Sequence, residues 1–169
     1  MLMTTRGIEG LRKKIRQFDA ECARALAQAG ESAQNDPNQY HDNFEYEEGM
    51  RQHGMLGKRI ADLLAILAQA VPAPTPVNTE AVCLGHVVKV RFLDDGETSE
   101  WLVCGDGEAS LFENACSVTS ELGQTLLGMR VGQRRSYRVP DRSITVEVLG
   151  IRIAEDQDFE LQNLPFGGK

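Results

Sequence analysis

The stretch that decides the first half of the fold is IEGLRKKIRQFDAECARALAQA, residues 8–29. Its apolar residues recur at alternating steps of three and four, which is the 3.5-residue repeat of a coiled-coil seam. The repeat predicts a long helix. A second run over residues 46–70 has the same spacing, weakened in its early half by Gly49 and His53, and predicts a partner helix. The seam positions of the first run are Ile8, Leu11, Ile15, Phe18, Cys22, Ala25 and Ala29.

Breaker and turn residues separate the two helical runs. A connection this short forces the two helices to lie antiparallel. About 30 residues at ~1.5 Å each give a rod of roughly 45 Å. The sequence therefore predicts a long, rod-like helical hairpin whose tip lies far from its base. The breaker and turn residues are Gly30, Asn35, Asp36, Pro37 and Asn38.

The tip of this hairpin is strongly acidic, because residues 25–50 carry six carboxylates and no Lys or Arg. Asp42 followed by Glu45 has the form of a helix-capping box, and the helix dipole favours acids in the first turn. Capping uses one or two carboxylates, so the surplus also fits a cation. Oxygen ligands without His or Cys select Mg²⁺ or Mn²⁺. Capping and metal binding both stay open for Asp42 and Glu45. The six carboxylates are Glu31, Asp36, Asp42, Glu45, Glu47 and Glu48.

Three prolines between residues 72 and 76 predict an extended linker, and a polar composition after residue 153 predicts a flexible tail. Between these segments, alternating apolar residues over 84–92 and a turn at 94–97 predict a β-hairpin that ends near Cys104. A short helix within 117–128 and strands at 134–139 and 144–153 follow. The expected class is α+β. Its parts are a hairpin domain over 1–71 with the tip at about 31–48, a linker over 72–78, a compact domain over 79–153 and a tail over 154–169.

Composition excludes several functional classes. The net charge of −7, from 18 basic and 25 acidic residues, argues against a general duplex binder. No apolar run approaches the ~20 residues of a membrane span, and no signal peptide is recognisable, so we expect a cytoplasmic protein. The sequence shows no catalytic Ser/His/Asp set, and Gly105-Asp-Gly-Glu108 lacks the lysine of a phosphate-binding loop. We therefore expect no enzyme. No Cys-x-x-Cys pair occurs, and buried thiols are expected at Cys22, Cys83, Cys104 and Cys116.

Several stretches, in their order and spacing, resemble the bacterial Gre transcript-cleavage factors, GreA and GreB. At the tip, Asp42-Asn-Phe-Glu-Tyr is similar to the family's Glu-Asn-Ala-Glu-Tyr. The resemblance implies an N-terminal antiparallel coiled coil followed by a C-terminal domain similar to the FK506-binding proteins. The other stretches are Met3-Thr-Thr-Arg-Gly, Gly57-Lys-Arg-Ile60, Leu84-Gly-His-Val-Val, Val103-Cys-Gly-Asp-Gly-Glu-Ala and Ser117-Val-Thr-Ser.

The resemblance also implies a partner and a task. The C-terminal domain would dock on bacterial RNA polymerase at the mouth of its secondary channel, and the hairpin would enter the channel. There Asp42, Glu45 and Asp36 would assist hydrolysis of backtracked RNA, with Asp42 and Glu45 sharing a Mg²⁺ ion with the polymerase active site. The chain would be an accessory factor with no cofactor of its own. It would be a monomer without a membrane partner, reaching the RNA 3′ end only within the elongation complex.

The tip departs from the family pattern at a position that matters. The family has an Asp three residues before the first Glu of the tip motif, and Gln39 stands there in this sequence. Asp36 replaces it only if the extra residue lies within the loop, and Asp42 is one methylene shorter than Glu. A non-cleaving modulator or inhibitor of the polymerase is therefore the alternative.

Two other functions rank lower. A peptidyl-prolyl isomerase needs an aromatic-lined groove, whereas the second domain has only about enough aromatic residues for one core. A helical-hairpin chaperone should expose apolar residues at its tip, where this chain has carboxylates. The aromatic residues concerned are Phe92, Trp101, Phe112 and Tyr137.

Overall fold

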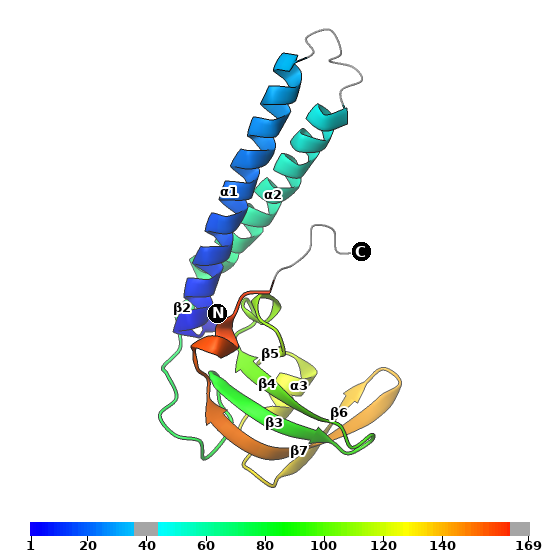
Figure 1. The fold of residues 1–169 in the computed structure, drawn as a ribbon. Coiled ribbons are helices and arrows are strands. Elements are labelled where there is room, and N and C mark those ends of the chain that lie inside the picture. Colours follow the sequence, from blue (N-terminus) through cyan, green and yellow to red (C-terminus); the bar gives the residue numbers. More distant parts are fainter. Residues whose placement is uncertain (36–43, 163–169) are drawn as a thin grey trace. The chain divides into compact units, whose positions relative to one another are not determined.

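The computed structural model describes residues 1–35 and 44–162, and the chain divides into two compact units (Figure 1). One unit is Leu11–Gln69, and the other joins Met1–Gly10 to the chain from Ala70 onward. The first ten residues thus belong with the C-terminal unit, whereas the sequence places them in the hairpin domain. The reason is pairing: strand β1 (Leu2–Met3) lies parallel to strand β2 (Val71–Pro72).

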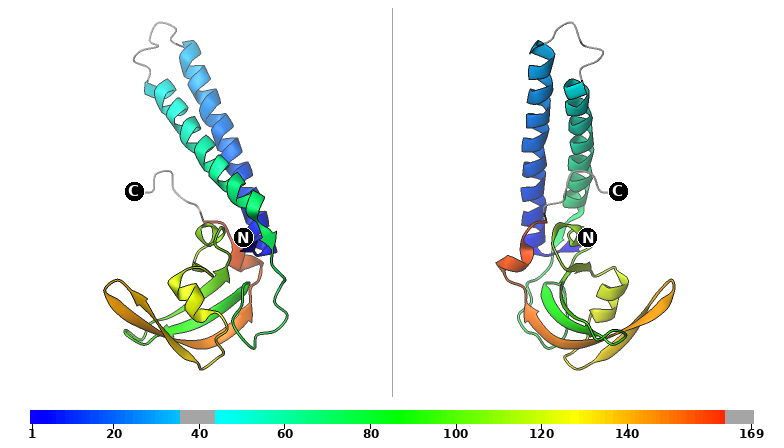
Figure 2. Two further views of the ribbon diagram at one scale, coloured as in Figure 1. Left: turned by 180° about the vertical axis from the view of Figure 1, so that it is seen from behind. Right: turned by 45° about the vertical axis from the view of Figure 1, so that its right-hand side comes forward.

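The first unit is a pair of helices. Helix α1 spans Thr5–Asn35 and helix α2 spans Phe44–Gln69, and the two run side by side in opposite directions (Figures 1 and 2). Gly30, expected to break the first helix, lies inside α1. A single glycine costs a helix only about 1 kcal/mol relative to alanine, which the surrounding helix-forming residues offset. The last two positions of the predicted seam on α1 are buried, with Ala25 4% and Ala29 1% exposed.

These small-residue layers bring the helices close together. A Cβ atom on Gly49 would lie 2.9 Å from the Cβ of Ala29 and 3.0 Å from the carbonyl oxygen of Ala25. One layer further on, the Cys22 thiol lies 3.8 Å from the carbonyl oxygen of His53. The layers that the sequence pattern marks as weak are therefore positions of close backbone approach.

The second unit contains a curled five-stranded sheet in the order β5-β4-β3-β7-β6 (Figure 2). Neighbouring strands are antiparallel except β4 and β5, which are parallel. Helix α3 (Glu121–Leu126) begins at its cap Ser120 and packs Leu126 into the core with Val88 and Val146. The expected α+β class is confirmed. The strands are β3 (His86–Phe92), β4 (Thr98–Cys104), β5 (Ala115–Ser117), β6 (Arg134–Val139) and β7 (Arg142–Ile153).

The chain after residue 153 differs from the expected tail. It forms a 3-10 helix, η2, over Asp156–Phe159, and a shorter one, η1, lies at Ala109–Leu111. Asp158 accepts two hydrogen bonds from Arg152, at 2.6 and 2.7 Å, and the Phe159 ring packs edge-on against Phe112 at 5.3 Å. The prediction of a tail was based on polar composition, which does not reveal individual contacts such as these two.

None of the described helices is both long enough and apolar enough to cross a membrane.

Candidate functional site

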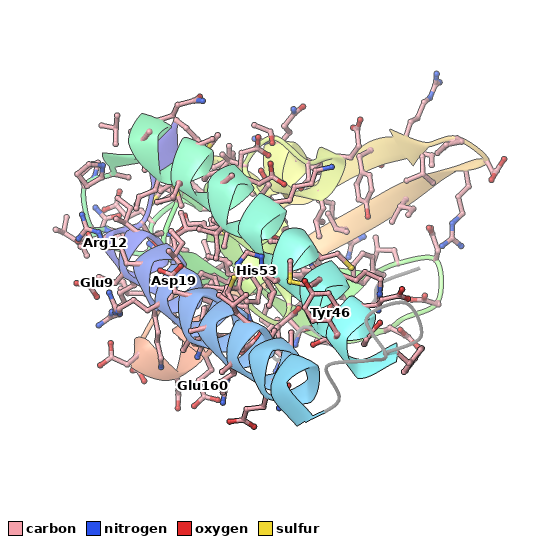
Figure 3. The ribbon with its side chains drawn as sticks, turned by 90° about the horizontal axis from the view of Figure 1, so that it is seen from above. Glu9, Arg12, Asp19, Tyr46, His53 and Glu160 are labelled. Carbon is pink, nitrogen blue, oxygen red and sulfur yellow. The ribbon has the colours of Figure 1, made fainter. Side chains whose placement is uncertain are left out.

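The predicted tip site lies mostly beyond what the structure describes. Asp36, Asp42 and Gln39 lie outside the described residues. Glu45 is in the first turn of α2, and its side chain is likewise outside the description. Their roles as ligands or caps therefore stay predictions. The structure describes the side chains that follow on α2, beginning with Tyr46 (Figure 3).

Glu48 is the tip carboxylate whose surroundings are clearest. Its two oxygens accept hydrogen bonds from Arg51 at 2.6 and 2.8 Å, and one of them also accepts from Gln52 at 2.9 Å. The Arg51 side chain and the Gln52 amide lower the pKa of Glu48 to about 2. The sequence counts Glu48 among carboxylates without a counter-charge, and this is wrong, because Arg51 stands just beyond the acidic segment. Glu48 is therefore satisfied within its own helix.

Three other side chains at this end of α2, those of Phe44, Glu47 and Met50, are exposed. Glu47 is exposed, and no ion pair is found for it in the part of the chain that the structure describes. Phe44 is 76% exposed and Met50 is 40% exposed. An acidic, partly apolar helix start of this kind can contact a partner surface. These side chains alone do not form a catalytic or metal-binding site.

Outside the tip, the described chain offers few groups for metal-binding or thiol chemistry. Among residues 1–35 and 44–162, no three His, Cys, Asp or Glu side chains come together in a way that could hold a metal ion. Cys104 and Cys116 are buried as expected, and burial raises the pKa of the Cys116 thiol to about 12. The expectation of burial is wrong for Cys83, which is exposed, and holds only partly for Cys22.

A buried carboxylate that the sequence did not single out organises the start of α1. Glu108 is fully buried and accepts hydrogen bonds from the Thr4 backbone N–H at 2.8 Å, the Thr4 hydroxyl at 2.7 Å and the Gly105 N–H at 2.5 Å. The Thr4 hydroxyl oxygen in turn accepts from the Gly7 N–H at 2.8 Å, which is a helix N-cap. We call these contacts the Thr4–Glu108 link.

The Thr4–Glu108 link explains two glycines. A Cβ atom on Gly7 would collide with the Glu108 carboxylate, and one on Gly105 would collide with the Leu2 carbonyl oxygen. Burial raises the pKa of Glu108, while the bonds from Thr4 and Gly105 act in the opposite direction. The sequence showed a glycine-rich loop without a phosphate-binding lysine; nothing in its spacing pointed to a residue about a hundred positions away.

Known proteins resemble both units of the chain. The family model for the C-terminal part of the GreA/GreB transcription elongation factors matches residues 77–153. Transcription elongation factor GreA of Thermotoga neapolitana is 30% identical over 142 residues, which cover 82% of this chain and 88% of that protein. The chain belongs to the GreA/GreB family. GreA of Thermosipho africanus is 27% identical over 151 residues, covering 89% of this chain and 96% of the relative.

A solved structure of the Thermus thermophilus protein GreA factor homolog 1 is 26% identical, covers 90% of this chain and 98% of that one, and has a TM-score of 0.41. The family model includes the loop of Glu108, so the Thr4–Glu108 link has one end inside the matched region. The η2 turn at Asp156–Phe159 lies beyond that region.

Proposed function

We propose that this GreA/GreB-family chain binds bacterial RNA polymerase through its secondary channel and stimulates hydrolytic cleavage of backtracked RNA. The observation that carries the proposal is the similarity to transcription elongation factor GreA over nearly the whole length of both chains. The chain acts as an accessory factor, and the polymerase carries out the hydrolysis. We place the protein in the cytoplasm as a monomer, where it meets the RNA 3′ end only within the elongation complex.

The two units divide the work in this proposal. The C-terminal unit, for which we retain the resemblance to FK506-binding proteins, docks on the polymerase. The hairpin brings Asp42, Glu45 and Asp36 to the active site. Carboxylate oxygens suit Mg²⁺, and one or two carboxylates suffice when other ligands come from a partner. Asp42 and Glu45 would hold the ion that the polymerase shares, and a bound Mg²⁺ stabilises developing negative charge on phosphoryl oxygens. Because Glu48 is engaged by Arg51, it is left out of this set.

A backtracked elongation complex tests the proposal. Replacing Asp42 with Asn keeps a good helix cap, so stability should change by less than ~0.5 kcal/mol. RNA cleavage should fall at least about tenfold while the affinity for polymerase is retained, if the lost charge removes a metal ligand. Asp62→Asn is the matched control, because Asp62 is an exposed carboxylate elsewhere on α2. Cleavage that survives Asp42→Asn would leave Asp42 as a cap only.

Gln39 favours a second candidate, a channel-binding modulator or inhibitor that does not cleave. It stands where the family has an aspartate. In the same assay, such a protein would slow elongation and leave backtracked RNA intact. Gln39→Asp then separates the two candidates. A gain of cleavage would show that the missing carboxylate limits the reaction, whereas no gain would favour the modulator.

A further inference from the structure

The arginines of the C-terminal unit are strongly clustered. Residues 130–142 carry five of the protein's 18 basic residues and one acid, Asp141, although the chain as a whole has a net charge of −7. A local basic cluster on an acidic protein gives the molecule a polarised field, which favours one orientation toward an anionic partner. The five residues are Arg130, Arg134, Arg135, Arg138 and Arg142.

Most of this cluster lies on a two-stranded ribbon. Strand β3 pairs with β7 from Val146 onward, and one more backbone hydrogen bond joins Leu93 to Thr145. Before that point β7 pairs with β6 alone, from Arg142 opposite Val139. The paired strands project from the sheet (Figure 1), and β6 is an edge strand. We call residues 134–145 the arginine ribbon.

Two arginines anchor the arginine ribbon. Arg134 donates to Glu147 at 3.2 Å, and Glu147 is only 14% exposed. Arg135 donates to the carbonyl oxygens of Thr125 at 3.2 Å and Leu127 at 2.9 Å, where α3 ends. These bonds fix the strands against the rest of the unit.

The other two arginines of the ribbon have no such task. Arg138 and Arg142 are exposed, and the guanidinium group of neither makes a hydrogen bond or an ion pair within the part of the chain that the structure describes. Ser136 and Ser143 are exposed beside them, and Ser136 shares a hydrogen bond with Thr145 at 2.9 Å. The ribbon therefore presents guanidinium and hydroxyl donors together.

We propose that the arginine ribbon binds the phosphate backbone of duplex DNA. The planar guanidinium of Arg matches phosphate with two parallel hydrogen bonds, and hydroxyl groups add further donors. The major groove of B-form DNA is about 12 Å wide and admits a two-stranded β-ribbon. Duplex RNA fits less well, because its major groove is deep and narrow. Single strands need exposed aromatic rings for stacking, whereas Tyr137 is half-buried.

A protein partner fits the ribbon less well than DNA. Protein interfaces are built on aromatic and apolar anchors in a desolvated centre. The exposed side chains of the arginine ribbon are charged or carry hydroxyl groups, apart from Pro140. The acidic remainder of the chain repels DNA, so the contact is short-ranged and lost at high salt. DNA binding is a property beyond the proposed cleavage function, and its test needs no polymerase.

The test is fluorescence anisotropy of a labelled duplex DNA with the full chain. At low salt, on the order of 20 mM, we expect saturable binding that weakens with salt, with a log–log slope of about −2 to −4 for two to four phosphate contacts. The variant Arg138→Gln/Arg142→Gln should bind at least about tenfold more weakly. The control Lys58→Gln/Arg59→Gln removes the same charge from α2 and should bind within about twofold of the wild type.

Three outcomes would overturn the proposal. One is the absence of binding by the wild type at the lowest salt. Another is equal weakening in both double variants, which would mean that net charge alone acts. The third is ribbon-dependent binding of a poly-glutamate peptide without binding of DNA, which would make the ribbon a protein-docking surface. Arg138→Lys/Arg142→Lys guards against misfolding: it keeps the charge, and its retained binding would support the phosphate contact.

Discussion

Replacing Glu108 with Ala should destabilise the C-terminal unit by about 3–5 kcal/mol, the cost of removing one partner from a buried, hydrogen-bonded charge. Three donors, two on Thr4 and one on Gly105, would lose their acceptor in a buried site. Net values for hydrogen bonds to charged groups are about 1.5–3 kcal/mol each. The sum is an upper bound, since burial of the carboxylate offsets part of it.

Glu108→Gln should cost much less, about 1 kcal/mol, because the geometry is kept. One amide oxygen can accept from the Thr4 and Gly105 N–H groups, which now share one carboxylate oxygen. The amide NH₂ then faces the Thr4 hydroxyl, which can reverse its role and accept. We therefore expect the wild type to be the most stable, Glu108→Gln to be slightly less stable and Glu108→Ala to be the least stable.

Urea unfolding followed by tryptophan fluorescence measures these differences in stability, because the probe lies in the C-terminal unit. Trp101 is the only tryptophan, and it lies on β4, in the same unit as the Thr4–Glu108 link. Thr4→Val replaces the hydroxyl by a methyl group and so also removes the cap of the Gly7 N–H. The loss of the cap is common to both arms of a double-mutant cycle with Glu108→Ala, which should therefore give a coupling of about 1–2 kcal/mol. An Ala variant within ~1 kcal/mol of the wild type, or a Gln variant as weak as Ala, would refute the reasoning.

Two further predictions follow from described contacts. Gly49→Ala should fail to stabilise the hairpin, since the added Cβ meets Ala29 and Ala25 and overpacking costs about 1–3 kcal/mol; Gly54→Ala, with open space around it, should gain about 0.5–1 kcal/mol in thermal unfolding. The raised pKa of Glu108 means that the folded state holds its proton more tightly than the unfolded state, whose pKa is near the ordinary 4.5. The free-energy advantage of wild type over Glu108→Gln should therefore be greatest below pH 4.5 and decline as pH rises through the raised pKa; an advantage that grows with pH would contradict this.

Periodicity predicted the elements whose burial follows a regular pattern. The 3.5-residue repeat gave both helices, and the alternation at Val88 and Val90 gave a strand whose residues are fully buried. Turn chemistry marked the β3–β4 connection, where Gly96 has a φ of 78°. These signals are local, so they survive without knowledge of the rest of the fold.

Features that depend on one distant partner could not be read in this way. Glu108 and Thr4 are 104 positions apart, and neither stands out in its own segment. The η2 turn depends on a single carboxylate, Asp158, meeting Arg152. Gly49 looked like a weak seam position because its lack of a side chain is useful only when Ala29 lies opposite. A sequence pattern reports the type of each residue, whereas the roles of these residues depend on which distant residue each one contacts in the fold.

The same distinction sorts the carboxylates of this protein. Glu108, Asp158 and Glu48 each accept hydrogen bonds from other residues of the fold, so these carboxylates have a structural role. Asp42 and Glu45 are left, with Asp36 and Glu47, in a segment whose sequence offers no cation until Arg51. Gathered like charges lower stability, and groups kept in spite of that cost are typical of functional sites. Neutralising Asp42 should therefore leave the stability of the free chain unchanged or slightly higher. A loss of cleavage without a loss of stability would be the signature of a tip that is completed only by its partner's metal ion.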